Sequence, residues 1–277
     1  MTRRSTLFGL ALALTAVLAA SAVAATVSSQ GVAAAGLKAV FSYVGQTPNV
    51  HGGHLKITQG SHVLYSRPVT AKLCGHRCGP AAVGHNAKSI GIAALQPLRP
   101  ANVILELFSG GANCCFIDQV FSYDPSHKTF VKTEHYFGNA GALIKPIGPH
   151  HRFEFRSANP AFQFVFTDGA DSGEPLQIWQ FADRAFADVT RSYPGLIRKD
   201  AARWFKFFKR DLSNGVGLIA AWAADEELLG QDAFVQSVLA TQANQGHLRA
   251  GNGGGNVSGH AFIAKLNRFL VKQGYKP

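Results

Sequence analysis

The chain has 277 residues and a formal net charge of +11 at pH 7, and 47% of its residues are hydrophobic. That length is enough for one large domain, or two small ones, with a real hydrophobic core. Beyond the N-terminal leader, no apolar run reaches the ~18 residues that a membrane-spanning helix needs, which excludes a second membrane-spanning candidate. A basic surface favours anionic partners such as wall polymers, lipid head groups or acidic glycans, although the same charge can serve solubility alone.

Residues 1–25 have the pattern of a secretory signal peptide. Arg3 and Arg4 form a positively charged start, an apolar run follows over residues 7–20, and Ala22-Val23-Ala24 supplies a cleavage site of the A-x-A type. The pattern fits either the general secretory or the twin-arginine route. We therefore predict a mature protein that is secreted to the extracellular space, the periplasm or the cell envelope. The leader holds two arginines and no acid, so the mature chain keeps a net charge of +9.

A β-rich domain is predicted for residues 37–193, after a small, polar segment at 26–36 that we expect to be a flexible tether. Short runs rich in Val, Ile, Phe and Tyr are bounded there by Gly, Pro, Asp or Asn, which is typical of antiparallel strands. The predicted strands cover residues 38–44, 54–59, 62–66, 102–108, 115–123, 129–137, 152–156 and 176–181.

Two of the predicted hairpins, at 121–130 and 179–186, repeat the same order of aromatic residues. Each has an aromatic-x-aromatic strand, a tight turn and a second strand that opens on Phe. Repeated hairpins of this kind suggest propeller-like blades, although any antiparallel meander would give the same pattern.

From residue 194 onward the hydrophobic period becomes that of helices. Apolar side chains recur at helical spacing around 197–208, 234–239 and 262–270. We expect about four helices in residues 194–277, packed on the β-rich domain. The predicted fold is therefore α+β: an antiparallel β-rich domain with propeller-like hairpins, followed by a C-terminal helical region.

The first predicted helix carries six basic residues and one acid between residues 198 and 210. Lys199, Arg203, Lys206 and Arg210 recur at i, i+4, i+7 and i+11, which places them in one stripe on the helix. Such a helix can lie on an anionic polymer or a lipid surface. The ordinary interpretation is that its aromatic side chains face the β-rich domain while its cations face water.

All four cysteines lie beyond the leader, as Cys74 and Cys78 in CGHRC and as the adjacent Cys114 and Cys115. An even number of cysteines in an oxidising compartment predicts disulfides. Three pairings are conceivable, and a ring between neighbouring cysteines is rare. We therefore favour bridges from Cys114 and Cys115 back to Cys74 and Cys78, each closing a loop of about 40 residues and contributing about 3–4 kcal/mol. A Cys/His metal site that includes His76 and a redox-active pair are the alternatives, although zinc sites prefer C-x2-C spacing.

The segment LELFSGGANCC at residues 105–115 resembles the SGGAHCC motif of a group of secreted bacterial proteins of unknown function. Those proteins look related to the FG-GAP/VCBS type of β-propeller repeat. The resemblance spans roughly residues 95–235 and continues through segments at 135–141, 164–181, 188–204 and 217–231. It implies a fold rather than a reaction, because the motif contains no mechanistic signature.

Proteins of that group often carry D-x-D-x-D-G-like loops that can hold calcium. The corresponding stretches here, 95–102 and 144–155, have no carboxylate before Glu154, and the acidic loop at 168–174 has Ala and Ser at alternate ligand positions. Five histidines fall between His51 and His85 with no carboxylate among them to orient a metal ligand. We therefore predict no cofactor and no metal.

No signature of catalysis stands out. G-x-S-x-G is absent, the glycine-rich segment at 251–259 follows no strand, and Asp225-Glu226-Glu227 is expected to be a solvated helix end. We predict a disulfide-stabilised binding protein, secreted or attached to the envelope, without catalytic residues. Its partner would be an anionic envelope polymer or a protein, and no specific recognition of nucleic acid is expected. Two alternatives stay open: a purely structural assembly partner, and an exported hydrolase that uses Asp124, His135, Asp168 and Asp171.

Overall fold

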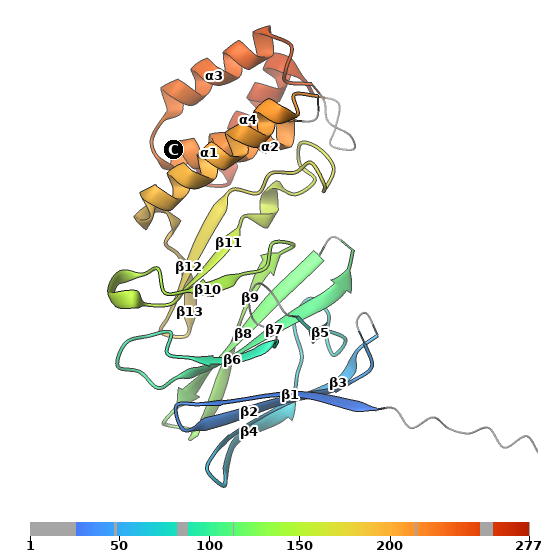
Figure 1. The fold of residues 1–277 in the computed structure, drawn as a ribbon, viewed down its shortest axis with the longest axis vertical. Helices are drawn as coiled ribbons and strands as arrows, with labels where there is room; N and C mark the ends of the chain where they lie inside the picture. The colour runs from blue at the N-terminus through green and yellow to red at the C-terminus, as the bar shows by residue number, and fades with distance from the viewer. Residues whose placement is uncertain are drawn as a thin grey trace, which may run out of the picture.

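The computed structural model describes residues 26–46, 49–81, 88–112, 114–213, 215–249 and 257–276. The predicted signal peptide therefore lies outside the described residues, as do His85 and most of the glycine-rich segment at 251–259. The described chain is a mixed α/β structure with mostly antiparallel sheets, and its four helices follow at the C-terminal end (Figure 1). The expected combination of an antiparallel β-rich part and C-terminal helices is confirmed.

The first sheet is a four-stranded antiparallel meander made of β1 (Val27–Ala34), β2 (Leu37–Val44), β3 (His51–Gln59) and β4 (His62–Pro68). The prediction of a flexible tether over residues 26–36 is wrong, because β1 pairs with β2 from Val27 opposite Val44 to Ala34 opposite Leu37. Ala35 and Gly36 both have positive φ, as the central residues of a tight primed hairpin turn require. Backbone pairing thus orders a segment whose small side chains gave no strand signal.

The central sheet is made of β5 (Gly79–Pro80), β6 (Ile90–Ala93), β7 (Asn102–Gly111), β8 (Cys114–Asp124) and β9 (Thr129–Gly138). Strand β7 is buried on both faces, which explains its nearly continuous apolar sequence. Val103 and Leu105 belong to the core shared with Phe41 of β2, whereas Ile104 belongs to the core shared with Phe155 of the next sheet. The central sheet is therefore the middle layer of the β-rich part.

The third sheet is made of β10 (Leu143–Lys145), β11 (Glu154–Ala158), β12 (Leu176–Ala182) and β13 (Ala185–Asp188). The β12–β13 hairpin of this sheet and the β8–β9 hairpin of the central sheet contain the two repeats of the aromatic pattern. Tyr123 lies opposite Phe130 in the β8–β9 hairpin, and Phe181 lies opposite Phe186 in the β12–β13 hairpin. Both repeats thus place an aromatic pair across two strands. No closed barrel or propeller is found in the described part of the chain, so the propeller-like arrangement stays a prediction.

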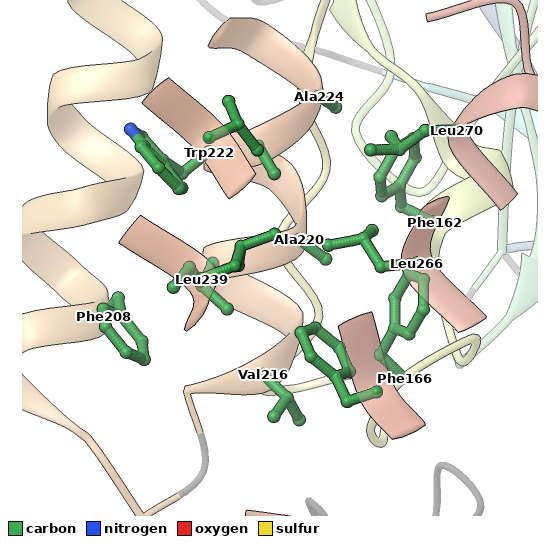
Figure 2. Close-up of a cluster of buried hydrophobic side chains, with 14 of the residues drawn as sticks. Phe162, Phe166, Phe208, Val216, Ala220, Trp222, Ala224, Leu239, Leu266 and Leu270 are labelled. Atoms are coloured by element: carbon green, nitrogen blue, oxygen red, sulfur yellow. The ribbon is translucent and has the colours of Figure 1, made fainter. Parts of the chain in front are cut away.

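The helices are α1 (Pro194–Arg210), α2 (Val216–Leu228), α3 (Asp232–Asn244) and α4 (Gly259–Lys272). Helix α2 is apolar on every side from Val216 to Ala224, and this part is almost entirely buried, as that composition requires. Figure 2 shows the core around it, where Trp222 of α2 and Leu266 and Leu270 of α4 lie in one cluster. Phe162 and Phe166, from the segment that precedes β12, join the same cluster.

Polar contacts also attach the helices to the β-rich part. The Asn159 side-chain amide donates to the Tyr275 hydroxyl over 3.0 Å, and the Lys265 ammonium donates to the Val165 carbonyl oxygen over 2.6 Å. Figure 1 places the helices at the end of the molecule opposite the β1–β4 sheet. Within the described residues, no helix has the length and apolar character needed to cross a bilayer.

Candidate functional site

The predicted basic stripe lies on the outer side of α1. Lys199, Arg203, Lys206 and Arg210 are all exposed, whereas Ile197, Ala201 and Phe208 on the other side of the helix are buried in the cores beneath it. The helical spacing sorts the two sets because residues three and four apart share a face. The structure therefore places these four cationic side chains on one exposed side of α1.

The expectation that the aromatic residues of α1 face the β-rich domain is wrong, because Trp204, Phe205 and Phe208 pack in the cluster around α2. One aromatic side chain of α1 faces outward instead. Phe207 is 39% exposed and lies one residue after Lys206, four residues after Arg203 and three before Arg210. We call these exposed side chains the basic-aromatic face: Lys199, Arg203, Lys206, Phe207 and Arg210. A rigid ring among long cationic side chains offers an apolar contact that a purely solvated helix face would lack.

Asp200, the single acid of this helix segment, holds Arg203 of the basic-aromatic face in place from the buried side of the helix. Asp200 is buried and accepts hydrogen bonds from the Trp204 indole over 2.9 Å and from the Leu176 backbone amide over 3.1 Å. Its other oxygen lies 2.8 Å from the Arg203 guanidinium, which also stacks 4.3 Å from the Trp204 ring centroid. Asp200 therefore fixes Arg203 and joins α1 to β12. In the part of the chain that the structure describes, Lys199, Lys206 and Arg210 have no ion-pair partner.

A second carboxyl group, that of Asp225, lies beside Asp200. Asp225 of α2 has no exposed surface and Glu227 is 4% exposed, so the expectation of a solvated helix end is wrong for both. Burial, and then the charge of Asp200, raises the pKa of Asp225 to about 10. Asp225 is therefore neutral at pH 7, while Asp200 forms the ion pair with Arg203.

The cysteines pair locally, which corrects the favoured prediction. Cys74 and Cys78 lie at disulfide distance from each other, and so do Cys114 and Cys115. Cys78 directly precedes β5, Cys115 belongs to β8, and β7 lies between those two strands. Two inter-strand spacings separate such positions by about 9.5 Å, which exceeds the ~7 Å between Cα atoms that a disulfide can bridge.

The surroundings of the two pairs differ. The Tyr136 hydroxyl on β9 lies 3.3 Å from the Cys114 sulfur and 3.2 Å from the Cys115 sulfur. Burial, and then the charge of Glu174, raises the pKa of Tyr136, so its hydroxyl keeps its proton beyond the usual range. Burial also raises the pKa of Glu174 to about 7. Cys114, Cys115, Tyr136 and Glu174 therefore form a second polar centre, distant in sequence from the basic-aromatic face.

The four candidates for a hydrolase are not assembled into one site. Asp118 of β8 lies opposite His135 of β9, and Asp124 lies six residues farther along β8, about 20 Å away at the rise of a strand. Asp124 contacts His127 and Arg184 instead. Asp168 and Asp171 belong to the loop before β12, where the Asp171 amide donates to the Asp168 carboxylate.

His135 is part of an aromatic cluster rather than a catalytic pair. Its ring centroid lies 4.5 Å from Phe137, 4.2 Å from Trp179 and 4.7 Å from Phe186. Burial lowers the pKa of His135 to about 4, against an opposing effect of Asp188. The imidazole is therefore neutral at pH 7 and packs as a side chain of the core between the central and third sheets.

A buried carboxyl pair was missed by the sequence analysis. Glu106 of β7 and Asp118 of β8 are cross-strand partners, and both are buried. Burial, and then the charge of Glu106, raises the pKa of Asp118 well above its usual range. Glu106 also lines a cavity of about 460 Å³ together with Lys88 and Ser89. An acid inside an otherwise apolar strand, as in NVILELF and CFIDQVF, is the signal that could have found the pair.

The histidine-rich segment does not form a metal centre in the described structure. His51, His62 and His76 are exposed, and His54 contacts the Ser66 hydroxyl over 3.4 Å. Across the described ranges, no group of three His, Cys, Asp or Glu side chains is close enough to hold a metal ion. Comparison with known proteins finds no matching family model, no matching curated protein and no matching solved structure.

Proposed function

We propose that the protein is a secreted or envelope-associated binding protein, which holds an anionic envelope polymer on the basic-aromatic face of α1. The observation that supports this proposal most directly is the set of three exposed cations, Lys199, Lys206 and Arg210, without ion-pair partners among the described residues. From Lys199 to Arg210 the face extends about 16 Å along the helix. It can therefore contact several charged units of one polymer chain at once.

A polymer fits this face better than a lipid bilayer. A helix that binds in the membrane interface buries a broad apolar side among the acyl chains. The broad apolar side of α1 is already used in the protein core, and Phe207 is the large apolar side chain exposed within the stripe. Exposed cations with one ring among them suit an anionic chain that stays in water, with charge supplying most of the attraction.

The binding role also agrees better with the structure than a hydrolase does. Asp124, His135, Asp168 and Asp171 are dispersed, and His135 is held neutral within aromatic side chains. Resemblance to the FG-GAP/VCBS type of repeat remains part of the proposal. It is supported by the order of strands, since the first and third sheets are four-stranded antiparallel meanders formed by consecutive strands.

The decisive experiment compares two variants that lose the same charge. The test variant carries Lys199→Gln, Lys206→Gln and Arg210→Gln, and leaves Arg203 in its contact with Asp200. The control variant carries glutamine at three exposed lysines outside the helical region: Lys38, Lys56 and Lys72. Binding of the mature protein to long-chain polyphosphate, as a soluble anionic polymer, is measured by titration at several salt concentrations.

We expect the test variant to bind polyphosphate at least tenfold more weakly. The slope of log affinity against log salt concentration should become shallower by about three, by analogy with phosphate contacts to nucleic acids. The control variant should stay within about threefold of the wild-type affinity, because its charges are remote from α1. Equal losses in both variants would show that net charge alone drives binding. Tighter binding to anionic lipid vesicles than to polyphosphate would replace the polymer with a membrane surface.

A further inference from the structure

The Cys114–Cys115 pair lies at the start of β8, where Cys114 is opposite Gly111 of β7. The two sulfurs differ in access. Cys114 is partly exposed, whereas Cys115 has no exposed surface. The neighbouring Tyr136 is 44% exposed, so a small molecule can reach the phenol and Cys114 from the same side of the hairpin. An exchange reaction between thiols and a disulfide needs one accessible sulfur and stabilisation of the sulfur that leaves.

We propose that Cys114 and Cys115 form a thiol–disulfide exchange site for a dithiol, either a small molecule or an exposed dithiol of another protein. Cys114 is the sulfur that the incoming thiolate attacks. Tyr136 is the catalytic hydroxyl that donates a hydrogen bond to the departing Cys115 thiolate. The proposal is independent of the basic-aromatic face and adds a chemical activity to the proposed binding role.

The reaction balances without a cofactor. One thiolate of the dithiol forms a bond to the Cys114 sulfur while the Cys114–Cys115 bond breaks, and Cys115 leaves with the bonding electron pair. The second thiolate of the dithiol then attacks the sulfur bound to Cys114 and releases Cys114 as a thiolate. The dithiol is oxidised to its disulfide, the protein pair is reduced to two thiols, and protons from the dithiol end on the two cysteines.

Tyr136 is suited to this role by position and by protonation. Its hydroxyl lies within 3.3 Å of both sulfurs, so the hydrogen bond can follow whichever sulfur gains charge. A hydrogen bond to a charged group is stronger than one to a neutral group, so the contact strengthens as the thiolate forms. The phenol must stay protonated to donate, and burial together with the Glu174 charge raises the pKa of Tyr136 in that direction.

The second pair provides a control inside the same molecule. Cys74 is partly exposed and Cys78 is buried, so this pair has the same asymmetry of access. Among the described residues, no hydroxyl forms a hydrogen bond with either of these sulfurs, whereas Tyr136 contacts both Cys114 and Cys115. A difference in rate between the pairs, if removed by changing Tyr136, is then attributable to the phenol.

The test measures how fast dithiothreitol opens each pair in the mature, secreted protein. Newly formed thiols are trapped with iodoacetamide at successive times and assigned by peptide mass spectrometry. We expect Tyr136→Phe to slow the opening of Cys114–Cys115 about tenfold and to leave the opening of Cys74–Cys78 unchanged. Thermal unfolding of the variant checks that the sheet is intact, since phenylalanine retains the ring.

A second measurement keeps the proposal testable if Tyr136→Phe does not fold. In Cys115→Ser, oxidised glutathione should form a mixed disulfide with Cys114, and in Cys114→Ser the buried Cys115 should react at least tenfold more slowly. Opening of the Tyr136→Phe pair at the wild-type rate would overturn the proposal. So would equal reactivity of the two cysteines, or the finding that Cys114 and Cys115 are free thiols in the secreted protein.

Discussion

The β-rich part and the helical part each bury two neighbouring acids, but they balance the charge differently. In the helices, Asp200 receives hydrogen bonds from Trp204 and from the Leu176 amide, and it forms an ion pair with Arg203. In the central sheet, Glu106 and Asp118 face each other across two strands, and one Asp118 oxygen has no hydrogen-bond partner among the described residues. The donors in the helices serve Asp200, while both oxygens of its neighbour Asp225, like that Asp118 oxygen, have no hydrogen-bond partner among the described residues.

The difference follows from the geometry of the two elements. A helix places residues three and four positions apart on the same face, so Arg203 and Trp204 reach Asp200 from the next turn. A strand sends alternate side chains to opposite faces, so an acid in a buried strand meets mainly its cross-strand neighbour. The helix therefore brings donors and a cation to its buried Asp200, whereas the strand brings Asp118 mainly its cross-strand neighbour Glu106.

The largest effect should come from removing the supported acid. Asp200→Ala leaves the Trp204 indole and the Leu176 amide without their acceptor, and we expect the free energy of unfolding to fall by about 3–4 kcal/mol. Asp118→Ala removes an acid whose pKa is raised by burial and one of whose oxygens has no hydrogen-bond partner among the described residues, and it should cost less. Urea unfolding at pH 7 measures both, with the exposed Lys199→Gln as a variant expected to change little. A larger loss for Asp118→Ala would reverse the comparison.

The next effect is a dependence of stability on pH. Burial raises the pKa of Asp225 in the folded protein to about 10, far above the usual range of an aspartate. Folding therefore retains a proton that the unfolded chain releases above about pH 4, so the stabilising contribution is present at low pH and declines as pH rises toward 10. The free energy of unfolding of the wild type should therefore fall between pH 5 and pH 8. That of Asp225→Asn should fall by about 1–3 kcal/mol less over the same range.

Asp118→Asn tests the same principle in the sheet. Its pKa is also raised, so its contribution declines with increasing pH in the same direction, and the amide should flatten the profile. Unfolding midpoints measured at several pH values give both slopes. If Asp225→Asn retains the full wild-type slope, Asp225 is ionised in the folded helices. The neutral state derived for that acid would then be wrong.

Much of the fold could be predicted because its strands have a plain signature. Residues 102–108 and 115–123 combine β-branched and aromatic side chains between turn residues, and the structure contains strands over both. Residues 27–34 form β1 although their side chains are small, because their backbone pairs with that of β2. The β propensity of a segment does not reveal whether a neighbouring strand is available to pair with it.

The candidate site was less predictable because its chemistry depends on which chain segments meet. The stripe on α1 follows from helical spacing alone, and sequence analysis found it. The contact partners of Asp200 and Cys115 cannot be derived from spacing, because Leu176 and Tyr136 lie on strands that are distant from them in the sequence. A buried acid leaves only a local trace in the sequence, a carboxylate within an apolar run, as at Glu106 in NVILELF. That trace marks the residue but not its partner.

The smallest expected effect tests how tightly the helices are joined to the β-rich part. A Cβ atom at Gly217 of α2 would overlap the Asp171 carbonyl oxygen and lie 2.7 Å from Thr167 Cγ2 in the loop before β12. Gly217→Ala should therefore lower the free energy of unfolding by about 1–2 kcal/mol, although alanine normally favours a helix. At Gly195 of α1 nothing lies within 4 Å, so Gly195→Ala should be neutral or slightly stabilising. The thermal unfolding midpoints of the two variants test this. Equal midpoints would mean that the loop before β12 moves to accommodate the added methyl group, so that the contact between α2 and this loop is not tightly packed.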